Sequence, residues 1–120
     1  MGSQSYRDLI VWQKSIVLCK IVYQTCESFP RSELYGLASQ MKRAAVSVAS
    51  NIAEGQGRQH LGEFRQFLAV ANGSLAELDT QRIIAEELTL IDRLRSSELE
   101  TIITEIRKML YALSNKLKSG

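Results

Sequence analysis

Apolar residues recur at steps of three and four along four separate stretches of the chain, which is the period of an amphipathic α-helix. The four stretches predict helices at residues 8–27, 32–54, 60–88 and 97–116. Most connections between them are short, and short links make consecutive helices antiparallel neighbours. No stretch alternates apolar and polar residues as a strand would. The pattern predicts an all-α fold, a single domain over residues 1–120 that forms an antiparallel up-down-up-down four-helix bundle.

The first predicted helix carries more apolar residues than one packing face of a bundle needs. Its core stripe is assigned to Leu9, Trp12, Ile16, Cys19, Tyr23 and Cys26. A second apolar set on another side consists of Ile10, Val17 and Ile21, and Val11, Leu18 and Val22 lie between the two sets. A monomer rarely leaves so large an apolar patch in water. The second set is therefore predicted to form the interface of a homo-oligomer.

Each of the other three helices is predicted to bury one apolar stripe. In the second helix the stripe is Leu34, Leu37, Met41, Ala44, Val48 and Ile52, flanked by Ala38, Ala45, Ala49 and Ala53. In the third it is Leu61, Phe64, Leu68, Ala71, Leu75 and Leu78, widened by Phe67, Val70 and Ile84. In the fourth it is Leu99, Ile103, Ile106, Leu110, Leu113 and Leu117. The small alanines of the second helix should let a neighbouring backbone approach closely.

The predicted helix ends rest on local signals. Pro30 should end the first helix, because the residue before a proline disfavours the helical region. The Gly-Gln-Gly segment at residues 55–57 should stop the second helix, since glycine is a favoured terminator. Ser97 and Glu100 have the spacing of a capping box and predict the start of the fourth helix.

Polar side chains gather on one side of the second helix, within a sector of about 100°. They are Gln40, Arg43, Ser47, Ser50, Asn51 and Glu54. One interpretation is a solvated face or a structural network, for example an ion pair between Arg43 and Glu77 of the third helix. The other is a site for a partner or for RNA that uses Lys42, Arg43 and Arg58. Ser74, Glu77 and Gln81 fall on the widened side of the third helix and are expected to be partly buried.

Charge and cysteine usage narrow the class of protein. The chain has 15 basic and 13 acidic residues, a net charge of +2, whereas dedicated nucleic-acid binders usually show a larger basic excess. Cys19 and Cys26 lie about 10 Å apart along one helix, too far for a disulfide, and predict buried thiols in a reducing compartment. Residues 1–6 lack the apolar core of a signal peptide, and no segment approaches the length of a membrane span. We expect a cytoplasmic protein without a membrane partner.

The residues that carry chemistry do not form a recognisable active site. The one histidine, His60, has no Glu-x-x-His motif around it, so neither a di-iron site nor a zinc site is expected. Cys19 and Cys26 lie on the assigned core stripe, where apolar surroundings make a thiol inert. The segment at residues 55–58 lacks the phosphate-loop motif and follows no strand, although an anion at the following helix start stays open. The sequence predicts no enzyme, no cofactor and no metal.

The junction of the second and third helices carries a recognisable motif. The run at residues 40–55 reads QMKRAAVSVASNIAEG and resembles the four-helix bundle proteins encoded in intervening sequences of bacterial 23S ribosomal RNA genes. The same resemblance extends to Tyr6-Arg7-Asp8-Leu9, Val11-Trp12, Phe29-Pro30, Glu33-Leu34-Tyr35-Gly36-Leu37, Glu63-Phe64, Phe67-Leu68, Gly73-Ser74-Leu75, Glu77-Leu78 and Gln81. It covers roughly residues 6 to 115.

The resemblance implies a cytoplasmic, non-enzymatic bundle that assembles into a ring-shaped homopentamer. More distantly, the chain is similar to accessory proteins of diversity-generating retroelements, pentameric bundles that bind RNA and a reverse transcriptase. Two hypotheses follow. The first is an oligomeric scaffold that binds RNA or a ribonucleoprotein partner. The second is a self-associating protein–protein interaction module without nucleic acid. A face that gathers Lys42, Arg43 and Arg58 would favour the first, and a face of mixed charge would favour the second.

Overall fold

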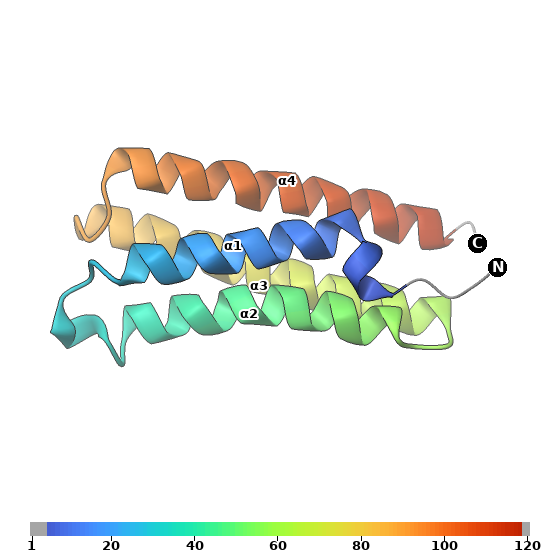
Figure 1. The fold of residues 1–120 in the computed structure, drawn as a ribbon. Coiled ribbons are helices and arrows are strands. Elements are labelled where there is room, and N and C mark those ends of the chain that lie inside the picture. The colour runs from blue at the N-terminus through green and yellow to red at the C-terminus, as the bar shows by residue number, and fades with distance from the viewer. Residues whose placement is uncertain (1–4, 119–120) are drawn as a thin grey trace.

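The computed structural model describes residues 5–118 and contains four long helices that alternate in direction (Figure 1). They are α1 (Ile10–Cys26), α2 (Leu37–Gln56), α3 (Leu61–Glu87) and α4 (Arg93–Lys118), with short 3₁₀ helices η1 (Tyr6–Asp8) and η2 (Arg31–Glu33) before α1 and α2. No strand occurs within this range, so the predicted all-α, up-down-up-down bundle is confirmed. The absence of a signal-peptide core concerned residues 1–6, of which residues 1–4 lie outside the described part.

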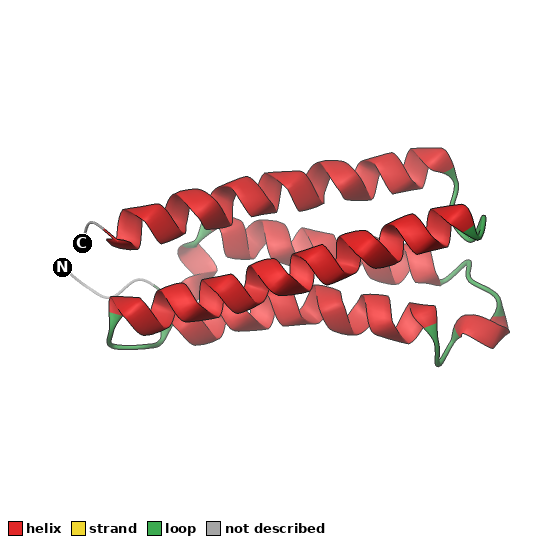
Figure 2. Ribbon diagram, turned by 180° about the vertical axis from the view of Figure 1, so that it is seen from behind, coloured by secondary structure: helices red, strands yellow, loops and turns green. Residues whose placement is uncertain are grey.

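Each helix packs against two neighbours around one core. α1 packs against α2, α2 against α3, α3 against α4 and α4 against α1, whereas in the described chain the Cα atoms of the diagonal pairs, α1 with α3 and α2 with α4, stay more than 8 Å apart. The result is an elongated molecule of 49 × 22 × 20 Å, with its loops at the two ends (Figure 2). No helix of residues 5–118 is long and apolar enough to cross a membrane.

The register assigned to the first helix is wrong by part of a turn. The side chains that α1 buries are Val11, Ser15, Leu18, Val22, Thr25 and Cys26. The residues placed between the two apolar sets thus form the centre of the packing face. Of the assigned stripe, Cys26 is buried as predicted, but the rest lies on one flank, with Ile16 and Tyr23 exposed. Because α1 is apolar on both flanks, sequence spacing alone could not locate the middle of its buried face.

The core stripes of the other helices are confirmed for most of their residues. Met41, Val48, Leu68, Leu75 and Ile103 are among the most deeply buried side chains. Their neighbours in the same stripes are also buried: Ala38, Ala44, Ala45, Ala49, Ile52, Phe64, Ala71, Leu78, Leu99, Ile106 and Leu110. Four residues assigned to the stripes or their flanks are exposed instead: Leu34, Leu61, Val70 and Ile84. Leu34 lies before the start of α2 and Leu61 is the first residue of α3, whereas Val70 and Ile84 lie on the side of α3 that was predicted to widen its stripe.

Two helix starts differ from the prediction. The second helix begins at Leu37 instead of residue 32, and the carboxylate of Glu33 in η2 accepts the N–H of Leu37 at 3.1 Å. The fourth helix begins at Arg93 instead of residue 97, because Asp92 caps it by accepting the N–H of Arg95 at 2.8 Å. Ser97 therefore lies inside α4, and no capping box operates there.

Gly55 lies within α2, although it was expected to stop that helix, and it marks a close approach between α2 and α3. A Cβ added there would lie 2.7 Å from Cβ of Phe67 and 3.0 Å from Cδ1 of Phe64. We expect Gly55→Ala to lower the free energy of unfolding by about 1–3 kcal/mol through overpacking, despite the better helix propensity of alanine.

Gly73, inside α3, is the matched control because an added Cβ meets nothing within 4 Å. Gly73→Ala should raise stability by about 0.5–1 kcal/mol. Urea titration of both variants measures the difference. Equal stabilisation by the two substitutions would contradict the close approach at Gly55.

Candidate partner surface

The three cations predicted as partner contacts do not form one cluster. Lys42 and Arg43 lie near the start of α2, whereas Arg58 follows its end, more than about 20 Å away at 1.5 Å per residue. Arg58 is paired with Glu54 at 2.7 Å, and its guanidinium also covers the ring of Phe67 at 4.8 Å. The basic footprint of this face is therefore confined to Lys42 and Arg43.

Lys42 and Arg43 border an open groove between α1 and α2. The groove has a volume of about 760 Å³, and its lining includes Tyr23, Tyr35, Lys42, Arg43 and Val46. The ammonium of Lys42 lies 5.0 Å from the centre of the Tyr23 ring, a cation–π contact. Tyr35, between η2 and α2, is 92% exposed. We call this surface the tyrosine groove. Exposed aromatic rings beside cations are the combination on which single-stranded nucleic acids stack.

A second groove lies on the other side of Arg43, between α2 and α3. Its lining is polar and includes Gln40, Arg43, Glu77 and Gln81. The carbonyl oxygen of the buried Gln81 side chain has no hydrogen-bond partner. Arg43 and Glu77 face the same groove, but no ion pair joins them within the described chain, so the suggested Arg43–Glu77 pair is not present. Gln81 is buried as expected, whereas Glu77 is exposed.

The polar side of α2 does contain a structural network farther along the same seam. The hydroxyls of Ser47 and Ser74 are 2.8 Å apart, which links α2 to α3. The amide of Asn51 donates to both the carbonyl and the hydroxyl oxygens of Ser47. The sector predicted from the sequence thus serves partly as a network between helices and partly, at Arg43, as free polar surface.

Exposed apolar side chains flank the buried stripe of α1 on both sides. Ile10 and Val17 are 63% and 46% exposed, and Ile21 is partly buried against the core. Lys14, one helical turn from Ile10 and Val17, pairs with Glu105 of α4, which places these residues on the α4 side of α1. We call Ile10, Val17 and Ile21 the α4-side row.

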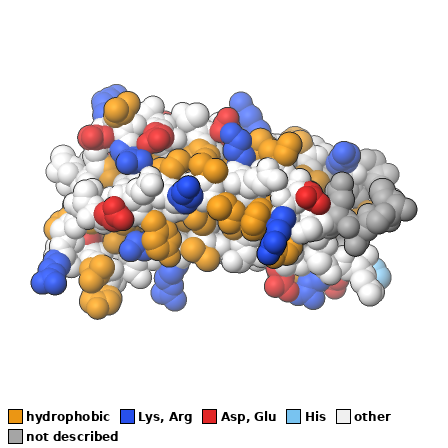
Figure 3. Space-filling model, in the orientation of Figure 1, with side chains coloured by type: hydrophobic (Ala, Val, Ile, Leu, Met, Phe, Trp, Pro, Cys, Tyr) orange, Lys and Arg blue, Asp and Glu red, His pale blue; other side chains and the backbone are white. Residues whose placement is uncertain are grey.

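The opposite flank of α1, toward α2, carries Trp12, Ile16 and Tyr23. We call Trp12 and Ile16 the α2-side row, whereas Tyr23 belongs to the tyrosine groove. Trp12 and Ile16 line a shallow groove together with Val46 and Ala49 of α2. Figure 3 shows hydrophobic side chains gathered along the α1 side of the bundle. The sequence predicted exposed apolar surface on α1 correctly, but it assigned the α2-side row to the core.

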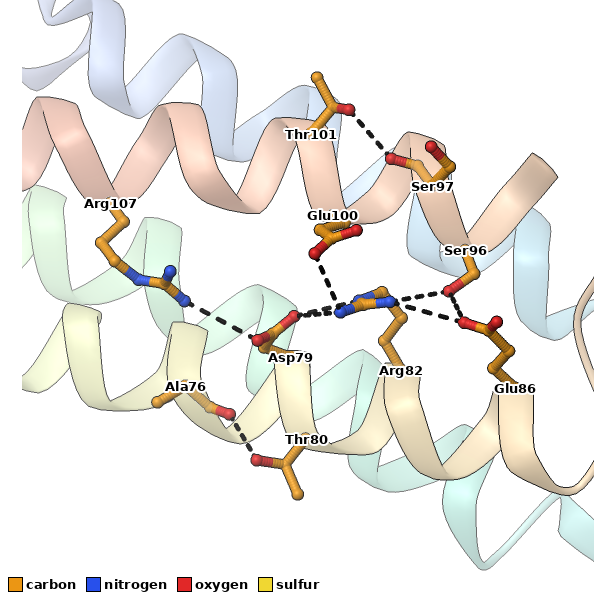
Figure 4. Close-up of polar contacts among 10 residues, drawn as sticks. All are labelled: Ala76, Asp79, Thr80, Arg82, Glu86, Ser96, Ser97, Glu100, Thr101 and Arg107. Carbon is orange, nitrogen blue, oxygen red and sulfur yellow. Dashed lines mark hydrogen bonds and ion pairs between the residues drawn. The ribbon is translucent and has the colours of Figure 1, made fainter. Parts of the chain in front are cut away.

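A buried arginine joins α3 to α4, and sequence reasoning missed it. Arg82 is 6% exposed, and its guanidinium contacts Asp79 at 2.9 Å and donates to the hydroxyl of Ser96 at 2.8 Å (Figure 4). Ser96 in turn donates to Glu86 at 2.6 Å, and Glu100 lies 3.8 Å from the guanidinium. The spacing of Asp79, Arg82 and Glu86 at i, i+3 and i+7 was the available signal, since all three occupy one side of a helix.

The chemistry of the cysteines matches that of packed thiols. Burial raises the pKa of the Cys19 thiol, and it raises the pKa of Cys26 against the opposing effect of the Lys42 charge. Both cysteines are free, and the thiol of Cys26 donates to the carbonyl of Ala38 at 3.8 Å. A raised pKa keeps a thiol protonated and poorly nucleophilic at neutral pH. Residues 5–118 contain no group of three acidic, histidine or cysteine side chains that could hold a metal ion.

The fold and these surfaces define a small all-α bundle whose distinctive features are exposed rows and grooves. The chain belongs to the 23S rRNA-intervening sequence protein family, whose model matches residues 7–112. The comparison with curated proteins found no match.

Among solved structures, the chain is similar to a protein of unknown function from the S23 ribosomal protein family of Bacteroides thetaiotaomicron. The two chains are 22% identical, with a TM-score of 0.78 over 88% of this chain and 98% of the other. That likeness supports the bundle fold.

Proposed function

We propose that this protein is a non-enzymatic scaffold that assembles with copies of itself. The observation that carries the proposal is the presence of two apolar rows on α1, one on each flank of its buried stripe, in which Ile10, Val17 and Ile16 are exposed and Trp12 and Ile21 are half-buried. Burying a full aliphatic side chain contributes about 1.5–3 kcal/mol, and a half-exposed one roughly half of that. Several such side chains on each subunit can offset the cost of association.

Two different rows suit a ring better than a two-fold dimer. A closed ring uses a head-to-tail interface, in which one face of a subunit meets a different face of the next. The α4-side row and the α2-side row supply two such faces on one helix. The number five comes from the family resemblance, whereas the exposed rows argue only for an oligomer.

A charge placed in the α4-side row should dissociate the assembly. Val17→Glu would bury an unpaired carboxylate at the interface, which costs several kcal/mol. We expect the sedimentation coefficient to fall to that of a smaller species. Thr80→Glu adds the same charge at an exposed position of α3, which lies diagonally across the bundle from α1, and should leave the assembly intact. If both variants dissociated the assembly to the same extent, the α4-side row would not be part of the interface.

We further propose that the scaffold binds RNA, alone or within a ribonucleoprotein, at the tyrosine groove. Tyr23 and Tyr35 supply stacking surfaces, and Lys42 and Arg43 supply phosphate contacts. A ring would repeat the groove in every subunit, so weak individual contacts would combine into useful affinity.

RNA binding at the tyrosine groove should depend steeply on salt, because each phosphate contact releases counterions. Arg43→Gln should reduce the slope of log K against log salt by about one for each groove engaged, and Tyr35→Ala should weaken binding about 5- to 100-fold with little change in slope. Arg58→Gln serves as the control, since Glu54 already neutralises that side chain. Fluorescence anisotropy with a labelled single-stranded RNA measures all three. A slope that responds equally to Arg43→Gln and Arg58→Gln would contradict the tyrosine groove as the site.

The second candidate function is a self-associating protein–protein interaction module without nucleic acid. The observation that favours it is the mixed charge of the face, where Arg58 is neutralised and Glu77 lies beside Arg43 in the polar groove. Purification of native complexes with and without nuclease distinguishes the two candidates. Partners lost on nuclease treatment support RNA, and partners retained support the protein module.

A further inference from the structure

A pocket between α3 and α4 combines an apolar floor with two arginines. It has a volume of about 310 Å³, near the lower end for small-molecule sites. Leu68, Ala69 and Leu110 contribute apolar surface, and Arg65, Arg107 and Tyr111 contribute polar groups. It lies on a different seam of the bundle from the tyrosine groove, and the proposed function does not use it.

The charge of Arg65 is unbalanced. Its Nε atom is buried and has no hydrogen-bond partner, and no ion pair involves its guanidinium within the described chain. A buried N–H group without an acceptor is costly, and native structures rarely keep one without a reason. Because Arg65 lines the pocket and has no carboxylate partner in the described chain, an anion bound in the pocket would supply the missing negative charge.

Arg107 also lacks a close carboxylate partner. Its Nη2 atom lies 4.0 Å from a carboxylate oxygen of Asp79, as Figure 4 shows. That carboxylate is already held by Arg82 at 2.9 Å. The guanidinium groups of Arg65 and Arg107 can therefore each donate hydrogen bonds to a bound anion. The hydroxyl of Tyr111, which also lines the pocket, adds a third donor.

We propose that this pocket binds a small organic anion, with its oxyanion group between Arg65 and Arg107 and its apolar body over Leu68 and Leu110. The apolar floor selects against a bare inorganic ion, because burying hydrocarbon surface contributes part of the affinity. The two guanidinium groups select against a neutral molecule of the same shape, which would leave them without an acceptor.

Calorimetric titration of the full chain in its native assembly tests the proposal, with four probes. Benzoate and phenyl phosphate carry both features and differ in their head groups. Inorganic phosphate lacks the apolar body, and benzamide lacks the charge. We expect measurable binding of benzoate, phenyl phosphate or both, and at least about tenfold weaker binding of the other two. No detectable heat with either aromatic anion at about 10 mM, the range of weak fragment binding, overturns the proposal.

Variants locate the site. Arg107 is partly exposed, so Arg107→Met leaves folding intact and should weaken binding about 10- to 100-fold. Arg65→Met should have a similar effect and should also raise the melting temperature of the ligand-free protein, because the unpartnered N–H is removed. Lys108→Met removes a neighbouring exposed cation that does not line the pocket, and binding should persist. Equal loss of binding in Lys108→Met and Arg107→Met would show attraction to general surface charge and overturn the pocket assignment.

Discussion

Leu68→Ala and Leu75→Ala should each lower the free energy of unfolding by about 2–5 kcal/mol. Both side chains are almost fully buried on the central stripe of α3, and α3 packs against both α2 and α4. The loss combines the transfer free energy of the removed atoms with the cavity that the neighbouring helices cannot close. The measurement is urea denaturation at one fixed protein concentration, because self-association makes apparent stability concentration-dependent.

Two further variants sharpen the test of the core. Leu94→Ala removes the same atoms from a side chain that is 82% exposed and should change stability by less than about 0.5 kcal/mol. Ala45→Leu adds atoms at a position with no exposed surface, and we expect a loss of roughly 1–3 kcal/mol. Unchanged denaturation midpoints in Leu68→Ala, Leu75→Ala and Ala45→Leu would contradict the helix register described here.

Arg82→Met should be the most damaging substitution of a charged residue, with a loss of roughly 2–4 kcal/mol. The substitution keeps an apolar stem but leaves Asp79, Glu86 and Ser96 without their shared donor. The loss is smaller than for a fully buried ion pair, because both carboxylates keep some access to water. Urea denaturation at low and high salt measures it.

Arg95→Met is the matched control for Arg82. Arg95 also pairs with a carboxylate on its own helix, Glu98 at 3.0 Å, but that pair is open to solvent. An exposed pair of this kind contributes about 0–1 kcal/mol and weakens as salt is added. The effect of Arg82→Met should persist at high salt, since its contacts are screened less. Equal effects of the two substitutions would mean that the buried network adds nothing to stability.

The sequence predicts the interior of this fold better than its edges. The stripes of α3 and α4 could be read from spacing because polar residues border them, and Leu68, Leu75 and Ile103 lie where expected. The start of α4 could not be read in the same way. Ser97 and Glu100 have the spacing of one capping signal, but Asp92 offers a competing cap five residues before the predicted start, and the longer helix also buries Ser96.

The register of α1 could not be derived from its sequence because the helix is apolar around most of its circumference. Only the positions of α2 and α4 decide that Leu18 and Val22 face the core while Ile16 and Tyr23 remain outside. The same ambiguity carries functional information, since a helix that is apolar on three sides exposes hydrophobic surface in any register. The prediction that α1 exposes apolar residues is therefore confirmed, although the predicted core stripe of α1 was wrong.

The residues of the partner surface could not be predicted from residue types alone. Lys42, Arg43 and Arg58 were predicted to share one partner or RNA surface, but the length of α2 separates Arg58 from the other two, and Glu54 neutralises it. Tyr35 was absent from the predicted site, since only the three-dimensional structure brings η2 and the start of α2 beside Tyr23.

Self-association is the central claim, and light scattering coupled to size exclusion tests it most directly. A chain of 13.5 kDa in a five-membered ring gives 5 × 13.5 = 67.5 kDa. We expect that mass at a subunit concentration on the order of 10 µM, at which an assembly with a dissociation constant well below this value is fully formed. A mass of 13.5 kDa across the whole concentration series would contradict the account, because the exposed rows of α1 would then have no partner surface of this chain to cover them.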